Sequence, residues 1–276
     1  MSGRLVVIGT PLGNLGDLSP RAVEALRSVD VLACEDTRRT GRLLAQVGVP
    51  APRLLRLDAT VERDRTDGLV GRIRDGAVVG LASDAGMPGV SDPGSHLIRA
   101  VRSAGLDVEV VPGPVAAVVA LVSCGLGGDT GRFTFEGFLP RRGRDRAERL
   151  GDIADSSCAV VVYESPHRVA ATVADLRAVC GGDREVSICR ELTKLHEEVW
   201  TGTLEQAVDH LAGREPRGEY VLVVDAAPPA EPVDDDVLTG AIAGELAAGA
   251  TRRDAARAVA ERFGVGVNRV KRLAGE

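Results

Sequence analysis

The sequence predicts an α/β protein with two α/β domains and a small helical segment at its C-terminus. Short apolar runs alternate with amphipathic stretches from residue 4 to about residue 225. Such alternation is typical of strands joined by crossover helices. A proline-rich stretch with acidic residues, AAPPAEPVDDD at 226–236, then separates this part from three short helical patterns at 237–248, 251–263 and 266–273.

The first predicted domain, residues 1–126, begins with a strand at Leu5–Gly9. Ser19 and Pro20 predict the N-cap and the first position of a helix, because serine accepts an amide hydrogen bond and proline has no amide to donate. The other elements expected here are a strand at 29–34, a helix at 37–47, a helix ending near Ile73, and strands at 77–82 and 108–111. A helix is expected after the turn that follows each of the last two strands.

The second predicted domain covers residues 127–226. Its strands are expected at 132–138, 159–163, 185–189, 197–200 and 220–224. A helix is expected at 145–153, a second from Ser165-Pro166 to about residue 179, and a third capped by Thr203. Because several strands look paired as hairpins, a mixed sheet is predicted. A linker at 227–236 and a helical segment at 237–276 complete the predicted organisation.

Composition excludes several classes of function. The formal net charge is −6, so no global basic field points to nucleic acid, although phosphate contacts need only a local patch. The five cysteines form no CxxC pair, and the histidines show no metal-ligand spacing. We therefore expect reduced cysteines, a cytoplasmic location and no metal. The longest uncharged run, 110–128, is broken by prolines and glycines, so no membrane association is expected.

Four turns that directly follow predicted strands are the candidate ligand-binding segments. Of these, the segment 83–94, SDAGMPGVSDPG, holds three glycines, two prolines and two aspartates. Such a rigid loop presents backbone groups and carboxylates, which suit an amino-acid-like or nucleoside ligand better than a phosphate. The turns at 9–15, 111–117 and 163–168 are equally compatible with plain strand-to-helix turns. All four could converge on one cleft at the strand ends.

Polar clusters offer candidates for acid–base chemistry and phosphate binding. They are Glu35 to Arg39 and Arg190 to Lys194, where helix-start acids and salt bridges are the alternative interpretation. Lys194 is one of only two lysines in an arginine-rich chain. Basic runs at 141–149 and 252–276 are equally compatible with solvated helix faces. With seven aromatic residues in the chain, base-stacking platforms are not expected.

Together these segments resemble the tetrapyrrole methylase family, and within it the branch that methylates small-subunit ribosomal RNA. The matching stretches are GTPLGNLGDLSPRA (9–22), EDTRRTGRLL (35–44), SDAGMPGVSDPG (83–94), PGPVAA (112–117), FEGFLPR (135–141), YESPHR (163–168), RELTKLHEE (190–198) and GEYVLVV (218–224). Two positions depart from the family pattern, which usually has threonine at Met87 and often proline at Gly9. Both lie in loops that would contact a cofactor.

The resemblance implies methylation of a cytidine ribose 2′-oxygen in the decoding centre of 16S ribosomal RNA. It implies S-adenosylmethionine as cofactor, held in a cleft between the two domains, and a homodimer. Two other functions stay open: a methyltransferase for a corrin precursor, and a non-catalytic RNA binder of the ribosome. By motif position, the cofactor site comprises Pro11, Leu12, Asp84, Gly86, Met87, Val90, Val115, Ala116 and Tyr163.

We also predict the residues that act on the RNA. A general base would take the hydroxyl proton, and the candidates are Lys194, if its amine is desolvated and neutral, or Glu35 or Asp36. The residues expected to contact RNA are Arg38, Arg39, Arg141, Arg142, Arg168 and Arg190.

Overall fold

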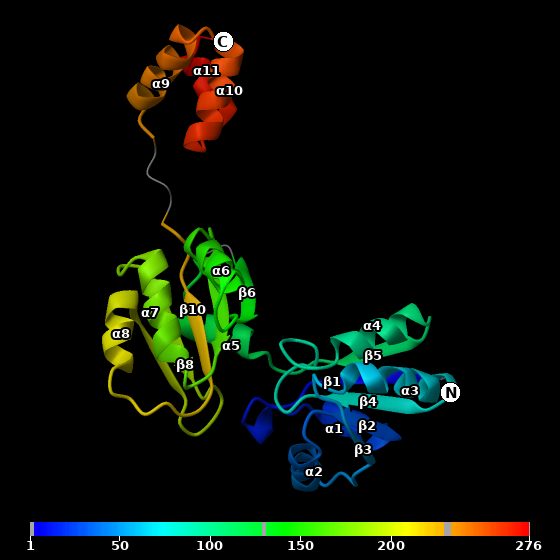
Figure 1. Ribbon diagram of the computed structural model, residues 1–276. Helices are drawn as coiled ribbons and strands as arrows, with labels where there is room; N and C mark the ends of the chain where they lie inside the picture. Colours follow the sequence, from blue (N-terminus) through cyan, green and yellow to red (C-terminus); the bar gives the residue numbers. More distant parts are fainter. Residues whose placement is uncertain (1–2, 129–130, 229–232, 276) are drawn as a thin grey trace. The chain divides into compact units, whose positions relative to one another are not determined.

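A five-stranded parallel sheet organises the first half of the chain in the computed structural model, which describes residues 3–128, 131–228 and 233–275 (Figure 1). In sheet order, the strands are β3 (Arg53–Arg56), β2 (Val31–Cys34), β4 (Val78–Ala82), β1 (Arg4–Ile8) and β5 (Asp107–Val111). Strands β2, β4 and β1 are almost fully buried because helices cover both faces of the sheet.

Side chains alternate between these two faces. Leu5 and Val7 of β1 pack with α3 (Glu62–Arg74) and α4 (Ser95–Ser103), whereas Val6 and Ile8 pack with α1 (Pro20–Ser28) and α2 (Thr37–Gln46). In a parallel sheet the carboxyl ends of all strands lie at one edge. The turns that follow β1, β2, β4 and β5 therefore meet at that edge.

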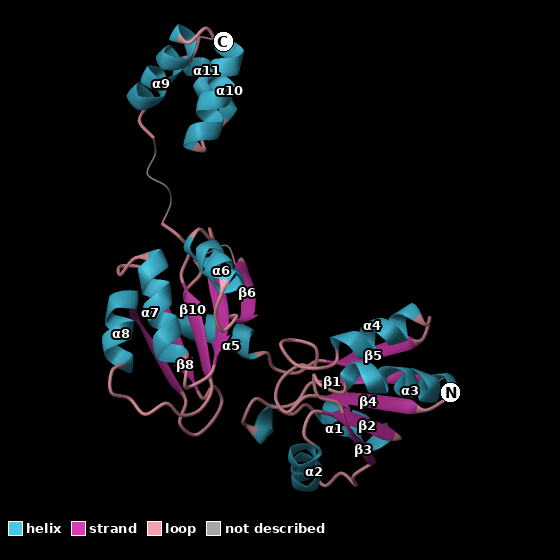
Figure 2. Ribbon diagram, viewed as in Figure 1, coloured by secondary structure: helices cyan, strands magenta, loops and turns pink. Residues whose placement is uncertain are grey.

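The second half of the chain forms a mixed sheet (Figure 2), as predicted. In sheet order, the strands are β6 (Phe133–Phe138), β7 (Ala159–Glu164), β10 (Tyr220–Val224), β8 (Glu185–Arg190) and β9 (Glu198–Thr203). β6 and β7 are parallel, and the other neighbours are antiparallel. Because β6 and β7 are parallel, both end at the same edge.

Helices also cover both faces of the second sheet. One face packs against α6 (Arg144–Ala154), α7 (Val169–Cys180) and α8 (Leu204–Leu211). The other face packs against α5 (Ala116–Cys124), whose Ala117 and Ala120 join the core formed by Val161, Cys189 and Val223. Thus α5, which precedes the predicted domain limit at residue 126, packs on the second sheet. Both sheets belong to one unit, Met1–Ala227.

The helix caps test the local predictions. The Ser19 side chain accepts a hydrogen bond from the Ala22 amide, and Thr203 forms a capping box with Gln206, so both predicted N-caps are confirmed. The predicted helix start at Ser165-Pro166 is wrong. There the amides of Arg168 and Val169 donate to the Ser165 carbonyl in a separate turn, and α7 begins only at Val169.

Two further elements were not predicted. β3 is an edge strand with two leucines between two arginines, a pattern without enough apolar residues to indicate a strand. A short 3-10 helix, η1 (Leu15–Asp17), follows the turn after β1 and is capped by Asn14.

The C-terminal unit, Pro228–Glu276, has a core of its own. It comprises α9 (Asp235–Ala247), α10 (Arg252–Phe263) and α11 (Val267–Leu273), which confirms the three predicted helices. Residues 229–232 of the predicted linker lie outside the described residues. No helix in the described part of the chain is long and apolar enough to cross a membrane.

Candidate functional site

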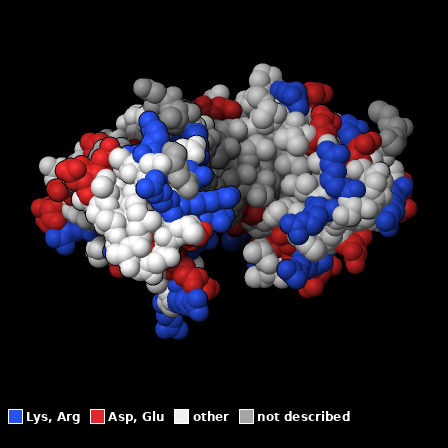
Figure 3. Space-filling view, turned by 90° about the horizontal axis from the view of Figure 1, so that it is seen from above, with Lys and Arg blue, Asp and Glu red and all other residues white. Residues whose placement is uncertain are grey.

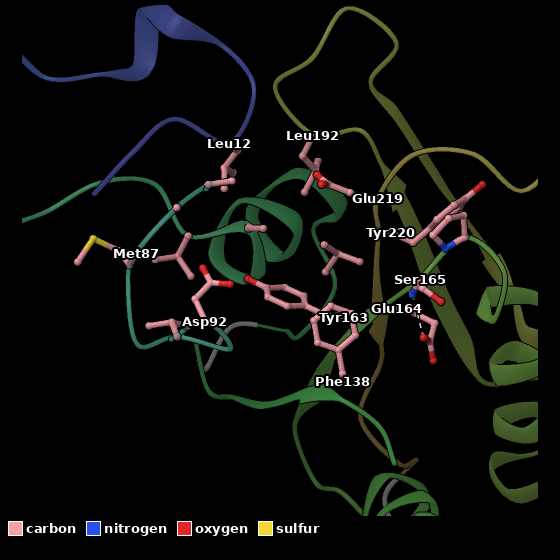
Figure 4. Close-up of a pocket in the computed structure, with 17 residues that line it drawn as sticks. Leu12, Met87, Asp92, Phe138, Tyr163, Glu164, Ser165, Leu192, Glu219 and Tyr220 are labelled. Carbon is pink, nitrogen blue, oxygen red and sulfur yellow. Dashed lines mark hydrogen bonds between the residues drawn. The ribbon is translucent and has the colours of Figure 1, made fainter. Parts of the chain in front are cut away.

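Turns from both halves of the first unit line one cavity of about 310 Å³ (Figure 4). The first half contributes Leu12, Ala85, Gly86, Met87, Val90, Asp92, Val115 and Ala116. The second half contributes Phe138, Tyr163, Glu164, Ser165, Pro166, Leu192, Glu219, Tyr220 and Val221. The walls are mainly apolar and carry a few polar groups, as expected of a site for a small organic ligand.

Backbone pairing holds the first-half turns together. Thr10 and Gly86 form an isolated antiparallel bridge, with N···O distances of 2.9 and 3.1 Å. The Gly9 amide donates to the Val111 carbonyl (2.9 Å), and the Thr10 hydroxyl donates to the Ser83 carbonyl (3.2 Å). These hydrogen bonds link the turns that follow β1, β4 and β5, so the cavity wall is one hydrogen-bonded assembly.

The turns after β1 and β5 pass each other at backbone contact. A Cβ atom on Gly113 would lie 2.7 Å from the Cα atom of Gly9, which is too close for any side chain. The Met87 sulfur accepts a hydrogen bond from the Gly113 amide and would lie 2.7 Å from a Cβ atom on Gly9. The two positions that depart from the family pattern, Gly9 and Met87, therefore occupy the same small space.

Asp92 places a carboxyl group in the cavity wall. Burial raises its pKa to about 6, helped by the neighbouring carboxylates of Glu35, Asp84 and Glu219. In Figure 4 the Tyr163 hydroxyl and the Asp92 carboxyl point toward each other. The Tyr163 oxygen accepts a hydrogen bond from the Ala117 amide (3.0 Å), and burial raises the Tyr163 pKa, so this hydroxyl keeps its proton. Above pH 6, Asp92 therefore places a negative charge in the cavity wall.

A second, polar pocket of about 720 Å³ lies at the carboxyl ends of β2, β3 and β4. It is lined by Glu35, Asp36, Thr37, Arg38, Arg39, Arg56, Asp58 and Asp84. Its carboxylates are largely paired with its arginines: Asp84 with Arg39 at 3.3 Å, and Asp36 with Arg38 at 3.2 Å. This pocket suits polar or charged parts of a substrate. Among the described residues, no group of histidine, cysteine and acidic side chains could hold a metal ion.

Glu35 and Asp36, the two acidic candidates for the general base, have pKa values shifted in opposite directions in this pocket. Asp36 is the N-cap of α2, and hydrogen bonds from the Arg38 side chain and amide lower its pKa to about 2. For Glu35, burial and the neighbouring Asp84 carboxylate raise the pKa. A carboxylate with a raised pKa is the better proton acceptor, which favours Glu35 over Asp36.

Lys194 could act as a base only if its amine were neutral, and its surroundings keep the amine charged. Its ammonium group donates to Glu191 (2.9 Å) and Glu219 (2.7 Å). Burial alone would lower the Lys194 pKa, but these two carboxylates outweigh burial and raise it. The prediction of a neutral Lys194 base is therefore wrong. Glu191 belongs to the same predicted polar cluster, but the sequence did not reveal that Glu219 also accepts from this ammonium group. The Lys194 side chain packs against Gly13 of the turn after β1.

The structure separates the six predicted RNA-binding arginines into two groups. Arg38, Arg39, Arg141 and Arg142 are exposed. Arg168 and Arg190 are only 27% exposed, and they donate to the Leu139 and Arg217 carbonyls, respectively. On the face shown in Figure 3, basic and acidic side chains lie intermixed. Any contact with a polyanion therefore depends on local groups of arginines.

The cavity brings together seven of the nine residues predicted for the cofactor. These are Leu12, Gly86, Met87, Val90, Val115, Ala116 and Tyr163. Asp84 lines the polar pocket instead, and Pro11 lines neither pocket. Sequence reasoning missed Asp92, Phe138, Leu192, Glu219 and Tyr220 as wall residues. Asp92 is the second aspartate of the 83–94 loop, and the other four lie in the family-matching stretches 135–141, 190–198 and 218–224, which were not assigned to the cofactor site.

Comparison with known proteins gives consistent relationships. The family described as Tetrapyrrole (Corrin/Porphyrin) Methylases matches residues 4–208. Ribosomal RNA small subunit methyltransferase I of Synechocystis sp. is 41% identical over 94% of this chain and 92% of that protein. The protein of the same name from Thermotoga maritima is 40% identical over 80% of this chain and 98% of that protein.

Solved structures share the fold at lower identity. The methyltransferase CobJ has a TM-score of 0.64 at 23% identity, covering 82% of this chain and 95% of that chain. Uroporphyrin-III C-methyltransferase from Thermus thermophilus, complexed with S-adenosyl homocysteine, has a TM-score of 0.57 at 20% identity, covering 81% of this chain and 97% of that chain. These matches confirm the predicted α/β architecture of residues up to about 225.

Proposed function

Because this chain belongs to the tetrapyrrole methylase family, we propose that it is an S-adenosylmethionine-dependent methyltransferase acting on a ribose 2′-hydroxyl of 16S ribosomal RNA. The acceptor we propose is a cytidine in the decoding centre of the small ribosomal subunit. Relatives that are 41% and 40% identical are ribosomal RNA small subunit methyltransferases I, which supports the RNA branch over the corrin branch. The observation that carries the proposal is the cavity at the strand ends, whose wall holds seven predicted cofactor residues and the Asp92 carboxyl.

The cavity fits S-adenosylmethionine in its chemistry. Apolar side chains such as Leu12, Val90 and Val115 suit the adenine ring and the methylene groups of the methionine chain, and the Asp92 carboxylate suits a cationic group. When bound, the cofactor supplies an electrophilic methyl group on a positively charged sulfur. Asp84 and Pro11 act from outside the wall in this proposal: Asp84 accepts a hydrogen bond from the Asp36 amide (3.1 Å), and Pro11 shapes the turn that carries Leu12.

Positioning is the main contribution that the protein makes to methyl transfer. The sulfonium loses its charge in the reaction, so stabilising a developing anion is not the central requirement. Alignment of the two reactants supplies about 7–11 kcal/mol of the barrier. The polar pocket holds the RNA backbone in this proposal, with Arg38 and Arg39 contacting phosphates at its rim. Arg168 and Arg190 serve RNA binding indirectly, because their guanidinium groups already hold protein carbonyls.

Glu35 is the base that we favour for the hydroxyl proton. A Glu35→Gln variant is expected to lower the single-turnover methylation rate by about 10²-fold, because a positioned base contributes about 10²–10⁴-fold. Asp36→Asn and Lys194→Met are the comparison variants, and they should keep most of this rate. Since the base must be deprotonated, the wild-type rate should rise with pH through the raised Glu35 pKa. Near-normal rates in Glu35→Gln would remove Glu35 from the mechanism.

The proposed activity is tested with small ribosomal subunits that lack the modification. Labelled S-adenosylmethionine should transfer its label to 16S ribosomal RNA, and an alkali-resistant dinucleotide should locate the methyl group on a ribose 2′-oxygen. Incorporation that resists ribonuclease would favour a corrin-type substrate. Absence of S-adenosylmethionine binding by calorimetry would favour a non-catalytic RNA binder.

We also propose that the protein works in the cytoplasm, since its proposed substrate is the ribosome. We further propose that it is a homodimer. Support for a dimer comes from α5, where Val118 and Val122 are 46% and 77% exposed. Residues four apart lie next to each other on a helix surface, and a contiguous exposed apolar patch marks a contact surface. Light scattering coupled to size exclusion should give twice the mass of the 276-residue chain, and a monomer mass would contradict this proposal.

A further inference from the structure

A buried group of charged and polar side chains lies behind the cavity wall, on the opposite face of the second sheet. Tyr163 and Glu164 end β7, and successive strand residues point to opposite faces. Tyr163 and Glu164 both line the cavity, but in Figure 4 the Glu164 carboxylate points away from the Tyr163 ring. The Glu164 side chain is 0% exposed. A buried carboxylate needs partners, and its partners show what it holds in place.

Glu164 joins two helices and a turn. Its carboxylate accepts hydrogen bonds from the Thr172 hydroxyl of α7 (2.7 Å) and from the Ser165 amide (2.8 Å), and it pairs with Arg168 at 3.3 Å. The Thr172 hydroxyl in turn accepts a hydrogen bond from Arg146 of α6 (3.1 Å). Arg146 is held further by Asp175, at 2.7 Å. We call these five residues, Glu164, Arg168, Thr172, Arg146 and Asp175, the Glu164 network.

Both arginines of the Glu164 network hold one short segment of backbone. Arg146 donates to the Pro140 carbonyl (2.9 Å), and Arg168 donates to the Leu139 carbonyl (2.9 Å). These carbonyls directly precede Arg141 and Arg142, which are exposed and have no partner within the described part of the chain. The guanidinium groups of Arg146 and Arg168 therefore fix the backbone segment from which the side chains of Arg141 and Arg142 project.

The position of this segment matters because β6 and β7 end at the same edge. Phe138, the last residue of β6, pairs with Tyr163, and both line the cofactor cavity. Arg141 and Arg142 follow Phe138 within four residues. Two arginines without a partner among the described residues thus follow closely on a wall residue of the cavity in which we place the methyl donor. A fixed loop binds a polyanion more tightly than a mobile one, because less freedom is lost on binding.

We infer that the Glu164 network is a positioning device that presents Arg141 and Arg142 to the phosphates of the substrate RNA beside the cofactor cavity. Thr172 and Asp175 are then positioning residues for RNA binding that touch neither substrate nor cofactor. This inference rests on the proposed function. It predicts that damage to the network impairs RNA binding and leaves the cofactor site intact.

The test uses the full-length protein with small ribosomal subunits that lack the modification. Thr172→Val removes the bridging hydroxyl and keeps the shape of the side chain, and Asp175→Asn weakens the hold on Arg146. Both variants are expected to raise KM for the subunits about fivefold to tenfold. Their kcat at saturating subunits and their Kd for S-adenosylmethionine, measured by calorimetry, should stay within twofold of wild type. Thr172→Ser keeps the hydroxyl and should behave as wild type.

A double-mutant comparison separates positioning from general destabilisation. In an Arg141→Ala/Arg142→Ala background, Thr172→Val should cause no further rise in KM, because the groups it positions are gone. The Thr172→Val variant and the Arg141→Ala/Arg142→Ala variant should both make fewer phosphate contacts. Their RNA binding should therefore depend less steeply on salt than that of wild type. A multiplicative effect of the two changes, or weaker cofactor binding with unchanged KM, would overturn the inference.

Limited proteolysis distinguishes a failure of this inference from a failure of the proposed function. Trypsin cleaves after arginine, and Arg141 and Arg142 are exposed, so in Thr172→Val without RNA cleavage at these two sites should be about tenfold faster than in wild type, whereas cleavage at the exposed Arg63 of α3 should not change. Unchanged cleavage after Arg141 and Arg142 would refute the positioning role whatever the substrate is. Faster cleavage in a protein that never methylates subunits would instead refute the proposed function and, with it, the RNA as the partner of this loop.

Discussion

An Asp92→Asn variant is expected to bind S-adenosylmethionine about 10- to 100-fold more weakly than wild type, since a hydrogen bond to a charged group contributes about 1.5–3 kcal/mol. Asp92 lines the cavity, and its carboxyl group lies opposite the Tyr163 hydroxyl. Asparagine keeps the shape of the side chain and removes its negative charge. Calorimetric titration at pH 7.5 measures the effect, because wild-type Asp92, with a pKa of about 6, is ionised there.

The pH dependence gives this prediction a second readout. A cation binds the ionised form of Asp92, so wild-type affinity should rise with pH up to about pH 6 and level off above it. In Asp92→Asn this rise should disappear. Asp67→Asn, a change at an exposed site on α3, is the matched control and should leave affinity unchanged. Equal affinities for wild type and Asp92→Asn would place the cationic group of the cofactor elsewhere.

The raised pKa of Asp92 also makes stability depend on pH, but stability should fall with rising pH where cofactor affinity rises. The folded protein holds the Asp92 proton up to about pH 6, whereas an unfolded chain releases it near the ordinary value of 3.8. The folded state therefore binds more protons between these two pH values, and the free energy of unfolding contributed by this group falls as pH rises through that window. Asp92→Asn should flatten this part of the stability profile, which thermal unfolding at several pH values can measure.

A Gly113→Ala variant is expected to lower the melting temperature and to abolish measurable cofactor binding. The new methyl group would lie 2.7 Å from the Gly9 Cα atom and 2.8 Å from the Gly9 carbonyl carbon, so one of the two turns must move. Overpacking of this kind costs about 1–3 kcal/mol, and each kcal/mol lowers the melting temperature of a protein of this size by roughly 2–4 °C. Movement of either turn also displaces the cavity wall that carries Leu12, Met87 and Val115.

Gly68→Ala is the matched control for this second prediction. Gly68 lies inside α3, and a Cβ atom there meets nothing within 4 Å. Alanine should stabilise the helix slightly, because glycine in a helix interior is less favourable by about 1 kcal/mol. Calorimetry for the cofactor and thermal unfolding should therefore show opposite outcomes for the two alanine variants. Wild-type behaviour of Gly113→Ala would mean that the two turns do not hold each other in place.

Most of the fold could be predicted because its signals are local. The caps at Ser19 and Thr203 depend on hydrogen bonds to amides three residues away, and the buried strands of the first sheet are continuous apolar runs. The start of α7 and the strand β3 were not predicted correctly, because their local sequence signals are misleading or weak. Ser165-Pro166 has the residues of a helix start, but a separate turn forms there, and the edge strand β3 is too polar to be recognised.

The two-sheet architecture, the C-terminal helices and the segments that build the cavity are all encoded locally, because residue type and spacing carry that information. The charges of the groups in the site depend instead on how the chain folds. Lys194 is charged because Glu219, 25 residues away in the chain, accepts its hydrogen bond, and Asp92 holds its proton more tightly because the fold buries it beside Glu35. A pKa depends on burial and on neighbouring charges, and the neighbours that matter here are brought together by folding from distant parts of the chain.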